Sequence, residues 1–316
     1  MEPIIAPIDK ALLRQELTRK LFLRKTNRGN NEIYIFTAQE APNAMREVGR
    51  LREVSFRTSG GGNGKACDID EFDTCENGYK QLIVWNPEME EIVGGYRYIH
   101  GADVIKHPWG TNVLATSHMF NYSDKFVKEI LPYTIELGRS FVAPTFQSTG
   151  LSAQTIFSLD NLWDGLGGLT VIHPDIKYFF GKVTMYADYN HRARNLILFF
   201  MDKYFHDDSN LVTPKEPVSV DGNIEEIKQA LCGKDLHEDY RLLKKEVRKL
   251  DINIPPLFSA YISLSPTLLL LGTAVNYEFS NVEETGILIR IDEILDEKKL
   301  RHIESFRKQL AEQQKE

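Results

Sequence analysis

The chain has 316 residues, 42% of them hydrophobic and 26% charged, which excludes disorder, fibres and coiled-coil rods and allows about two domains of ~150 residues. Its longest apolar runs are far shorter than the ~20 residues of a membrane-spanning helix, and early prolines argue against a secretory signal, so we expect a cytoplasmic protein. The formal net charge is -7, and three cysteines without C-x-x-C spacing favour reduced thiols over a disulfide framework or a structural zinc site.

The first 30 residues are basic, although the chain as a whole is acidic. They carry seven basic and three acidic side chains, a local balance of +4. Asp9 can cap a helix that runs to about Lys25, with leucines along one stripe and basic residues on the other face. We therefore predict a basic N-terminal helix within residues 1–30. Its pattern is typical either of a solvated helix face or of a surface that binds an acidic partner.

The remaining elements alternate between strand and helix patterns. Predicted strands are 32–37, 81–85, 92–99, 133–142 and 178–185, and predicted helices are 39–57, 123–131, 152–169 and 192–205. Beyond residue 207 the patterns indicate charged helices between 224 and 250, strands at 267–277 and 285–291, and a charged helix from 296. We therefore predict an α/β fold with a mostly antiparallel central sheet flanked by helices. Residues 31–206 would form its core, and 207–316 a C-terminal extension that completes the same unit.

Several motifs of well-known chemistry are incomplete or missing. The glycine-rich loop 59–64 ends like a phosphate-binding loop, but Ser59 and Ala66 break that pattern, so a flexible lid over a site is the better interpretation. The acidic run 68–73 does not satisfy the calcium-loop pattern, because Phe72 stands at a ligand position. There is no G-x-S-x-G, H-E-x-x-H or H-x-x-x-x-D motif. We expect no metal site and no resident cofactor.

Three charged residues lie inside predicted strands. Arg97 shares a face with apolar residues of strand 92–99, and Glu136 and Arg139 lie among the apolar residues of strand 133–142. A charge in such a place costs several kcal/mol unless it is paired or meets a ligand. One alternative is that Arg97 and Glu136 pair with each other. The other is a site, in which a bulge at Gly138 brings Glu136 and Arg139 to one side of the sheet.

The segment that follows this strand contains a turn suited to phosphate. Gln147 is followed by Gly150 and Ser152 at the start of a predicted helix, where free backbone N–H groups attract anions and glycine permits close approach. Serine and threonine are also ordinary helix caps, so the turn fits either a phosphate cradle or a plain helix start.

These features together resemble the GNAT acyltransferases, whose Q/R-x-x-G-x-G/A turn is similar to Gln147-x-x-Gly150-x-Ser152. A GNAT-like fold is what this resemblance implies. The charged series in order along the chain also resembles that of the acyl-homoserine-lactone synthases; it comprises Arg52, Phe56, Asp68, Asp70, Asp73, Arg97, Glu136 and Arg139.

A closer resemblance is to the hemolysin-like N-acyltransferases, the group that includes the ornithine-lipid and glycine-lipid N-acyltransferases. The matching segments are 68–73, 82–85, 92–97, 136–144, 161–166 and 254–257, and the resemblance spans about residues 45 to 292. It implies transfer of a long, often 3-hydroxylated fatty acyl chain from acyl carrier protein or coenzyme A to the α-amine of an amino acid such as glycine or ornithine. A signal synthase of the lactone type and a noncatalytic lipid-associated protein with this fold remain alternatives.

The resemblance also implies roles for the residues. Glu136 is the expected base for the amine, with Arg97 and Arg139 binding the acceptor carboxylate or orienting Glu136. Strand amides near 138–142 are expected to hold the thioester carbonyl. The residues expected near the acyl donor are Phe141, Val142, Gln147, Gly150 and Ser152. Those expected to bind the acceptor or order the lid are Arg52, Phe56, Asp68, Asp70 and Asp73. The basic first segment would suit acidic acyl carrier protein or the anionic inner face of a membrane, and no nucleic-acid partner is expected.

Overall fold

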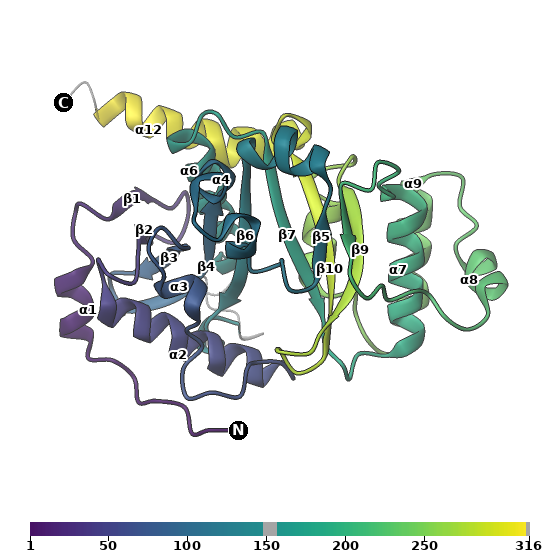
Figure 1. Cartoon of the computed structure of the whole chain (residues 1–316), viewed down its shortest axis with the longest axis horizontal. Helices are drawn as coiled ribbons and strands as arrows, with labels where there is room; N and C mark the ends of the chain where they lie inside the picture. The colour runs from purple at the N-terminus through teal and green to yellow at the C-terminus, as the bar shows by residue number, and fades with distance from the viewer. Residues whose placement is uncertain (148–156, 314–316) are drawn as a thin grey trace. The chain divides into compact units, whose positions relative to one another are not determined.

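The computed structural model, drawn in Figure 1, describes residues 1–147 and 157–313. Its chain divides into two compact units. Unit 1 comprises Met1–Ala115, Leu131–Lys177 and Leu295–Glu316, and unit 2 comprises Thr116–Ile130 and Tyr178–Ile294. The two units interleave along the sequence, whereas the predicted segments follow one another.

Five antiparallel strands form the sheet of unit 1. In spatial order they are β1 (Phe22–Lys25), β2 (Glu32–Phe36), β3 (Lys80–Asn86), β4 (Glu91–His100) and β6 (Thr134–Val142). The hairpin of β3 and β4 confirms the two neighbouring strands predicted from their apolar runs. The strands are rich in β-branched and aromatic residues, and Ile33, Leu82 and Val84 are fully buried.

The two faces of this sheet carry different side chains, because residues alternate along a strand. Gln81 lies opposite Arg97, and Arg97 lies opposite Gly138, so these residues share one face. Helix α2 (Pro42–Thr58) covers that face and reaches Gln81 through a buried arginine. Helix α6 (Ser158–Ile172) covers the other face, where Gly165 closely approaches Leu82.

A bulge interrupts β6 next to Gly138, the position at which the sequence predicted one. Arg97 pairs with Gly138 and Gly95 with Phe141, so Arg139 and Ser140 together lie opposite the single residue Tyr96. Arg139 has φ 51°, in the left-handed region, which a bulge residue adopts to turn the strand. The bulge lies one residue later than predicted, and it aims Arg139 toward the same face as Arg97.

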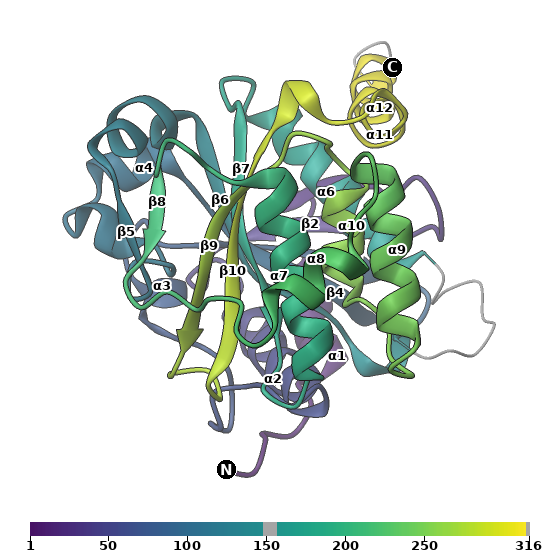
Figure 2. The ribbon, with the colours of Figure 1, turned by 90° about the vertical axis from the view of Figure 1, so that its right-hand side faces the viewer.

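Unit 2 has its own antiparallel strands and helices. Strand β10 (Val282–Arg290) pairs on one side with β7 (Tyr178–Met185) and on the other with β9 (Leu269–Asn276), and the short β5 (Phe120–Tyr122) pairs with β8 (Val212–Pro214). Figure 2 shows the helices of this unit, in which α7 (His191–Phe205) and α9 (Leu236–Arg248) lie side by side. The shorter helices are α8 (Ile224–Ala230) and α10 (Pro256–Ile262).

The helices of unit 1 not yet described are short. They are α1 (Lys10–Glu16), α3 (Glu71–Thr74), α4 (Gly101–Lys106), α11 (Asp296–Lys299) and α12 (Ser305–Gln313), with a π-helical turn at Leu300–Glu304. The prediction of an α/β fold with a mostly antiparallel sheet flanked by helices is confirmed. Within the described residues, no helix combines the length and apolar character needed to cross a membrane.

The predicted N-terminal helix begins as expected, capped by Asp9, but its extension to Lys25 is wrong. Its helical part ends at Glu16, and Phe22–Lys25 is a strand that pairs with β2. Arg24, expected on an exposed basic face, is buried and donates hydrogen bonds to the carbonyl of His302 and to Asn27. The segment was misassigned because its leucines recur at helical spacing, whereas pairing with a partner strand depends on residues far from it.

Candidate active site

Three arginines and three aspartates meet on the α2 face of the unit 1 sheet. The arginines come from α2, β4 and β6, and the aspartates come from the segment around α3. They are Arg52, Arg97, Arg139, Asp68, Asp70 and Asp73, all of them predicted site residues. Their opposite charges balance, which is what allows so many ionised groups to be buried together.

The spacing of the acidic run builds one side of this cluster. Asp70 caps α3 by accepting a hydrogen bond from the amide of Asp73, and the Asp73 carboxylate accepts one from the amide of Asp70. This reciprocal capping box needs two short acceptors three residues apart, which the sequence supplies. It places both carboxylates side by side, facing β4.

Arg52 ties α2 to this run. Its side chain is fully buried, and its Nη1 lies 3.0 Å from Oδ2 of Asp73. Its Nη2 donates to the side chain of Gln81 on β3, which itself donates to Asp73 at 2.9 Å. Burial opposes the ionisation of Asp73, but Arg52 and Arg97 outweigh it and hold the pKa of Asp73 well below its usual range.

Arg97 is the centre of the cluster. Its Nη1 donates to Asp70 at 2.7 Å and lies 3.1 Å from Asp73. Its guanidinium also stacks over the ring of Tyr79, 4.8 Å from the centroid. Burial alone would lower the pKa of Arg97, but Asp73 and Asp70 outweigh it and raise that pKa well above its ordinary value. The structure therefore gives Arg97 two aspartate partners.

Arg139, which lies in the bulge of β6, is the third arginine of the cluster. Its Nε lies 3.0 Å from Asp68, and its Nη2 lies 3.7 Å from Asp70. With 16% of its side chain exposed, against 3% for Arg97, it is the most accessible of the three arginines. The bulge predicted to re-aim this residue is thus present, and Arg139 is the least buried of the three arginines.

The glycine-rich loop is held in place by α2. Glu53, fully buried, accepts a hydrogen bond from the amide of Gly64 at 2.9 Å and pairs with Arg57. Asn63, at the tip of the loop, donates to Asp68 at 2.7 Å. The loop predicted as a lid therefore contacts the aspartates directly and is anchored by a carboxylate at its base.

Glu136 lies beside the cluster on β6 and is only 2% exposed. The hydroxyl of Tyr79 donates to its Oε2 at 2.6 Å and accepts a hydrogen bond from the amide of Ala115 at 2.8 Å. Burial and the charge of Glu136 raise the pKa of Tyr79 well above its ordinary value, so this phenol stays protonated and donates. The Glu136 carboxylate, held by the neutral hydroxyl of Tyr79, thus lies next to the cluster of three arginines and three aspartates.

The predicted acyl-donor residues follow the bulge. Phe141 is buried, and the carbonyl of Val142 accepts hydrogen bonds from Ser55 and from the side chain of Gln147. Gly150 and Ser152, predicted to complete the phosphate-binding turn, lie outside the described residues. Phe56 is buried one turn after Arg52 on α2.

Sequence reasoning missed three residues that connect the site: Tyr79, Gln81 and Asn63. None belongs to a recognisable motif. The available signal was indirect, because a carboxylate predicted on a buried strand needs a nearby donor, and Tyr79 immediately precedes β3 of the same sheet. Among the described residues, no group of three or more histidines, cysteines and carboxylates is arranged to hold a metal ion.

Comparison with known proteins identifies the family. A family model described as an acetyltransferase (GNAT) domain matches residues 51–156, which contain the whole cluster. The chain is 59% identical over 306 residues to a glycine N(alpha)-acyltransferase of Bacteroides thetaiotaomicron, covering 97% of this chain and 91% of that protein. It is 56% identical over 315 residues to a glycine N(alpha)-acyltransferase of Phocaeicola vulgatus, covering 100% of this chain and 97% of that protein.

Two solved structures are distantly similar. One is FeeM, an N-acyl amino acid synthase from uncultured soil microbes, with a TM-score of 0.38 and 11% identity over 83% of this chain and 91% of that chain. The other is BjaI, a CoA-dependent acyl-homoserine lactone synthase, with a TM-score of 0.37 and 10% identity over 89% of this chain and 90% of that chain.

The resemblance to GNAT-fold N-acyltransferases predicted from the charged series is confirmed, and the protein is an acyltransferase. Since the relatives match over nearly their full length, the chain belongs to the glycine N(alpha)-acyltransferase family of GNAT-fold acyltransferases.

Proposed function

We propose that this protein transfers a long-chain 3-hydroxy fatty acyl group from acyl carrier protein to the α-amine of glycine. The observation that carries the proposal is identity of 56% or more, over nearly the full length, to two proteins named for acylation of glycine. The product is a lyso-lipoamino acid, the N-acylated glycine. The acyl thioester is a co-substrate, and no resident cofactor takes part.

Glu136 is the base in this proposal. The glycine amine must lose a proton to attack a thioester, and a carboxylate within hydrogen-bonding reach, directly or through one water, accepts it. Tyr79 fixes one carboxylate oxygen of Glu136 and is itself fixed by the amide of Ala115. This arrangement supports a base with one defined orientation, in which Tyr79 is a positioning residue.

Arg139 recognises the glycine carboxylate in this proposal. Its side chain is 16% exposed, and its guanidinium pairs with Asp68 and Asp70. Arg97 is buried against Asp70 and Asp73, which supports a positioning role for it. An arginine fork suits a carboxylate better than a lysine, because it can donate two parallel hydrogen bonds.

Besides a base and a carboxylate-binding group, the reaction needs a place for the thioester carbonyl, which the bulge of β6 supplies in this proposal. As the amine nitrogen attacks, the carbonyl oxygen gains negative charge, and backbone amides aimed at it lower the barrier. Arg139 and Ser140 lie together opposite Tyr96, so the strand turns there and re-aims its amides. The C–N bond then forms, the C–S bond breaks, and the carrier leaves as a free thiol after taking up the proton.

We place this reaction in the cytoplasm, with product release at the inner face of the membrane. A long acyl chain on glycine is an amphiphile, and each buried CH₂ group contributes about 0.8 kcal/mol to membrane partitioning. Contact of the enzyme with the membrane would therefore be peripheral.

The proposal is tested with purified protein, a 3-hydroxyacyl carrier protein and glycine. We expect N-acylglycine by mass spectrometry, together with release of free carrier thiol, and less product with ornithine. Replacement of the carrier by the corresponding acyl coenzyme A tests the donor. Absence of any acylated amine, or a lactone product, would overturn the proposed function.

The role of Glu136 is tested separately. Glu136→Gln should lower kcat/KM about 10²-fold or more, because general-base catalysis is lost while the shape of the side chain is kept. Glu284→Gln is a matched control, since Glu284 is another buried glutamate on a strand and pairs with Lys182 at 2.7 Å in unit 2. It should lower stability and keep kcat/KM. Full activity in Glu136→Gln would remove it as the base.

A further inference from the structure

The exposed face of α9 is entirely basic. Its residues recur at helical spacing on one side of the helix and are all exposed; they are His237, Arg241, Lys244, Lys245, Arg248 and Lys249. Five of the six carry a full positive charge, on a chain whose formal net charge is -7. We call this surface the α9 basic face.

The acidic and apolar residues of α9 point elsewhere. Leu243 and Val247 are fully buried on the side that packs against α7. Asp239 is buried as well, where it pairs with Lys203 at 2.6 Å and accepts a hydrogen bond from Tyr204. The fold of unit 2 thus buries Asp239, keeps Glu238 and Glu246 half-buried at the edges of the helix face, and leaves the basic side chains exposed.

The α9 basic face keeps most of its charge uncompensated. Arg241 lies 3.7 Å from Glu238, and Lys249 lies 2.6 Å from Glu246, so these two are partly neutralised at the edge of the face. For Lys244, Lys245 and Arg248, the part of the chain that the structure describes contains no acidic partner in an ion pair. Lys244 instead lies over the ring of Tyr240, 4.0 Å from its centroid.

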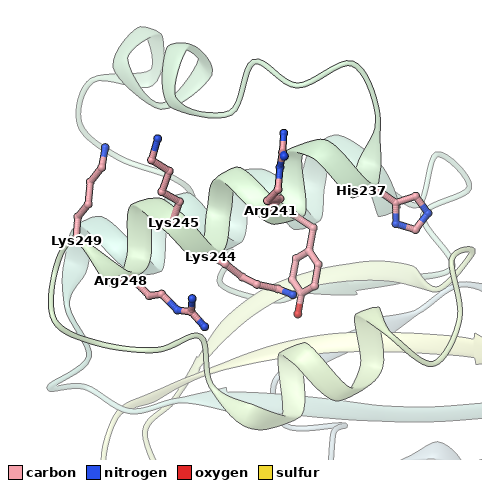
Figure 3. Close-up of a pocket in the computed structure, with 7 residues that line it drawn as sticks. His237, Arg241, Lys244, Lys245, Arg248 and Lys249 are labelled. Atoms are coloured by element: carbon pink, nitrogen blue, oxygen red, sulfur yellow. The ribbon is translucent and has the colours of Figure 1, made fainter.

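The face is also hollowed. A depression of about 660 Å³ is lined by the six basic residues and Tyr240. Figure 3 shows two rows of side chains: Arg241, Lys245 and Lys249 extend to one side of the helix, and Lys244 and Arg248 extend to the other. Two rows of cations, one along each side of the helix axis, match a partner that presents several carboxylates, such as the exposed edge of an acidic helix.

The basic N-terminal segment, which the sequence suggests as such a surface, has about half of its cations neutralised by acidic partners. Lys10 pairs with Glu91 at 2.8 Å, Arg14 with Glu90 at 2.9 Å and Lys20 with Glu40 at 3.6 Å. Each of these three cations therefore has an acidic neighbour within unit 1. They are a charge-matched comparison for the α9 basic face.

The composition of the face favours a protein partner over a membrane. Helices that bind membranes lay exposed aromatic or aliphatic side chains into the acyl region. On α9, none of the exposed residues is a large apolar one, since its leucines and valine face inward or lie half-buried. Contact through charge alone is typical of the steering surfaces that recruit an acidic protein.

We propose that the α9 basic face docks the acidic carrier protein that delivers the acyl group. The proposal rests on the donor assigned under the proposed function and adds the surface that binds it. Docking there is electrostatic, so affinity falls as salt is added.

The test compares two triple variants with equal loss of charge. In the first, Lys244, Lys245 and Arg248 are replaced by Gln, which keeps helix propensity; in the control, Lys10, Arg14 and Lys20 are replaced by Gln. The Kd for acyl carrier protein is measured at low and at near-physiological ionic strength. We expect the α9 variant to raise the Kd about tenfold or more at low salt and to flatten its salt dependence, while the control stays within about twofold of wild type.

Steady-state kinetics distinguish an effect on docking from an effect on the chemical step. The α9 variant should raise KM for acyl carrier protein with little change in kcat. Its rate with an acyl-pantetheine thioester, which has no protein to dock, reports the chemical step alone.

The outcomes distinguish the docking surface from the proposed function. An unchanged Kd and KM in an α9 variant that still acylates glycine would overturn the docking surface and leave the proposed function unaffected. A variant that loses binding to anionic phospholipid vesicles and keeps binding to the carrier would show a membrane surface instead. If wild type binds the carrier through α9 but acylates no amine, the function fails and the surface stands.

Discussion

Arg139 combines a place in the candidate site with an unusual backbone conformation. Its φ of 51° lies in the region that L-residues with a Cβ adopt at a cost of roughly 1–2 kcal/mol, and which glycine adopts freely. The bulge persists because the guanidinium is held by Asp68 and Asp70. The backbone of Arg139 is thus held in a strained conformation that places its guanidinium beside the two aspartates.

This strain is measurable at position 139 itself. Arg139→Gly and Arg139→Ala both remove the guanidinium, but the glycine variant should be about 1 kcal/mol more stable, because only it relaxes the left-handed backbone. The neighbouring Ser140, whose φ is not positive, should show the opposite order, with Ala more stable than Gly. Urea unfolding of the four variants gives both differences. An alanine variant at 139 as stable as the glycine variant would contradict a strained bulge.

Tyr79 is the residue whose removal best tests the orientation of Glu136. Tyr79→Phe deletes a donor to the carboxylate and an acceptor for the Ala115 amide, both buried, and should cost about 1–3 kcal/mol of stability. We expect kcat/KM to fall about tenfold or more, because the base is no longer held. The acidic limb of the kcat–pH profile should move to higher pH, because the carboxylate loses a donor that favours its charged form.

A second buried tyrosine provides the control. Tyr98 lies on β4 of the same unit and is as deeply buried as Tyr79. Tyr98→Phe should leave kcat and its pH profile unchanged. A Tyr79→Phe enzyme that loses stability but keeps the wild-type pH profile would limit Tyr79 to a structural role.

At the scale of elements, α6 and the C-terminal segment are joined by close backbone contact. A Cβ on Gly167 of α6 would lie 2.2 Å from the carbonyl oxygen of His302. That carbonyl also accepts a hydrogen bond from Arg24, and the His302 ring pairs with Asp164 at 2.7 Å. Glycine at 167 is therefore required by the approach of another backbone, and no side-chain rotation relieves it.

Two adjacent glycines allow a matched test of this contact. Gly167→Ala should destabilise unit 1 by about 2–3 kcal/mol or more, because the carbonyl of His302 has to shift. At Gly168 the nearest atom to an added Cβ is the end of the Leu23 side chain, at 2.7 Å, which can rotate away. Gly168→Ala should therefore cost clearly less. Urea midpoints that are equal for the two variants would show that the contact is loose.

The segment around α3 predicts how stability depends on pH. The pKa of Asp73 is held below its usual range, so its ion pairs contribute stability that is complete above about pH 4, near the pKa of an unfolded aspartate, and is lost as pH falls through the native pKa. Asp73→Asn should cost about 3 kcal/mol or more at neutral pH, because two buried arginines lose a counter-charge.

The difference between wild type and Asp73→Asn should therefore shrink as pH is lowered below about 4. Free energies of unfolding measured in urea between neutral and acid pH give this comparison. Asp124→Asn is the control, since Asp124 pairs with Lys128 on the surface, and it should change little at any pH. A pH-independent gap for Asp73→Asn would contradict the assignment of its stability to charge.

The elements that could be predicted are those whose own pattern decides their structure. Helix α2 and the β3–β4 hairpin have strong periodicity and matched their predicted ranges closely. Strand β1 could not be predicted, because its four residues continue the spacing of the preceding helix and become a strand only by pairing with β2. Strands β5 and β8 have three residues each, too few for any periodic signal.

The sequence predicted which residues gather in the candidate site better than it predicted how they are arranged. A charge on a buried strand demands a partner, which singled out Arg97, Glu136 and Arg139. Which partner each one takes depends on how strands and α3 come together, so the aspartate partners of Arg97 and the contact of Glu136 with Tyr79 were not foreseeable. The bulge could be expected near Gly138, yet its exact position depends on pairing with β4.

At the scale of the whole molecule, positive charge is redistributed relative to the linear sequence. Of the basic residues near the N-terminus, Lys10, Arg14 and Lys20 are paired and Arg24 is buried within unit 1. The α9 basic face lies amid a charged stretch of mixed sign in the sequence, and it becomes predominantly positive because folding turns Asp239 inward. Local charge along a chain is therefore a poor guide to the charge of a surface.

The interleaved units predict a selective effect of truncation. A chain ending at Ile294 lacks the third segment of unit 1 but retains all of unit 2. Hydrogen exchange should show lost protection in α6 and β1, where Asp164 and Arg24 lose the partners that residue 302 provides, and retained protection in β9 and β10. Equal loss of protection in both units would show that they unfold as one.

The contact between Arg24 and His302 also has a consequence for synthesis of the protein. The two residues are separated by 278 positions, so β1 can form this contact only after the turn that contains His302 has been synthesised. Every residue of unit 2 leaves the ribosome before the final segment of unit 1 does. The unit that contains the candidate active site is therefore the last to be completed, and a nascent chain released before residue 302 lacks the partner that Arg24 and Asp164 contact.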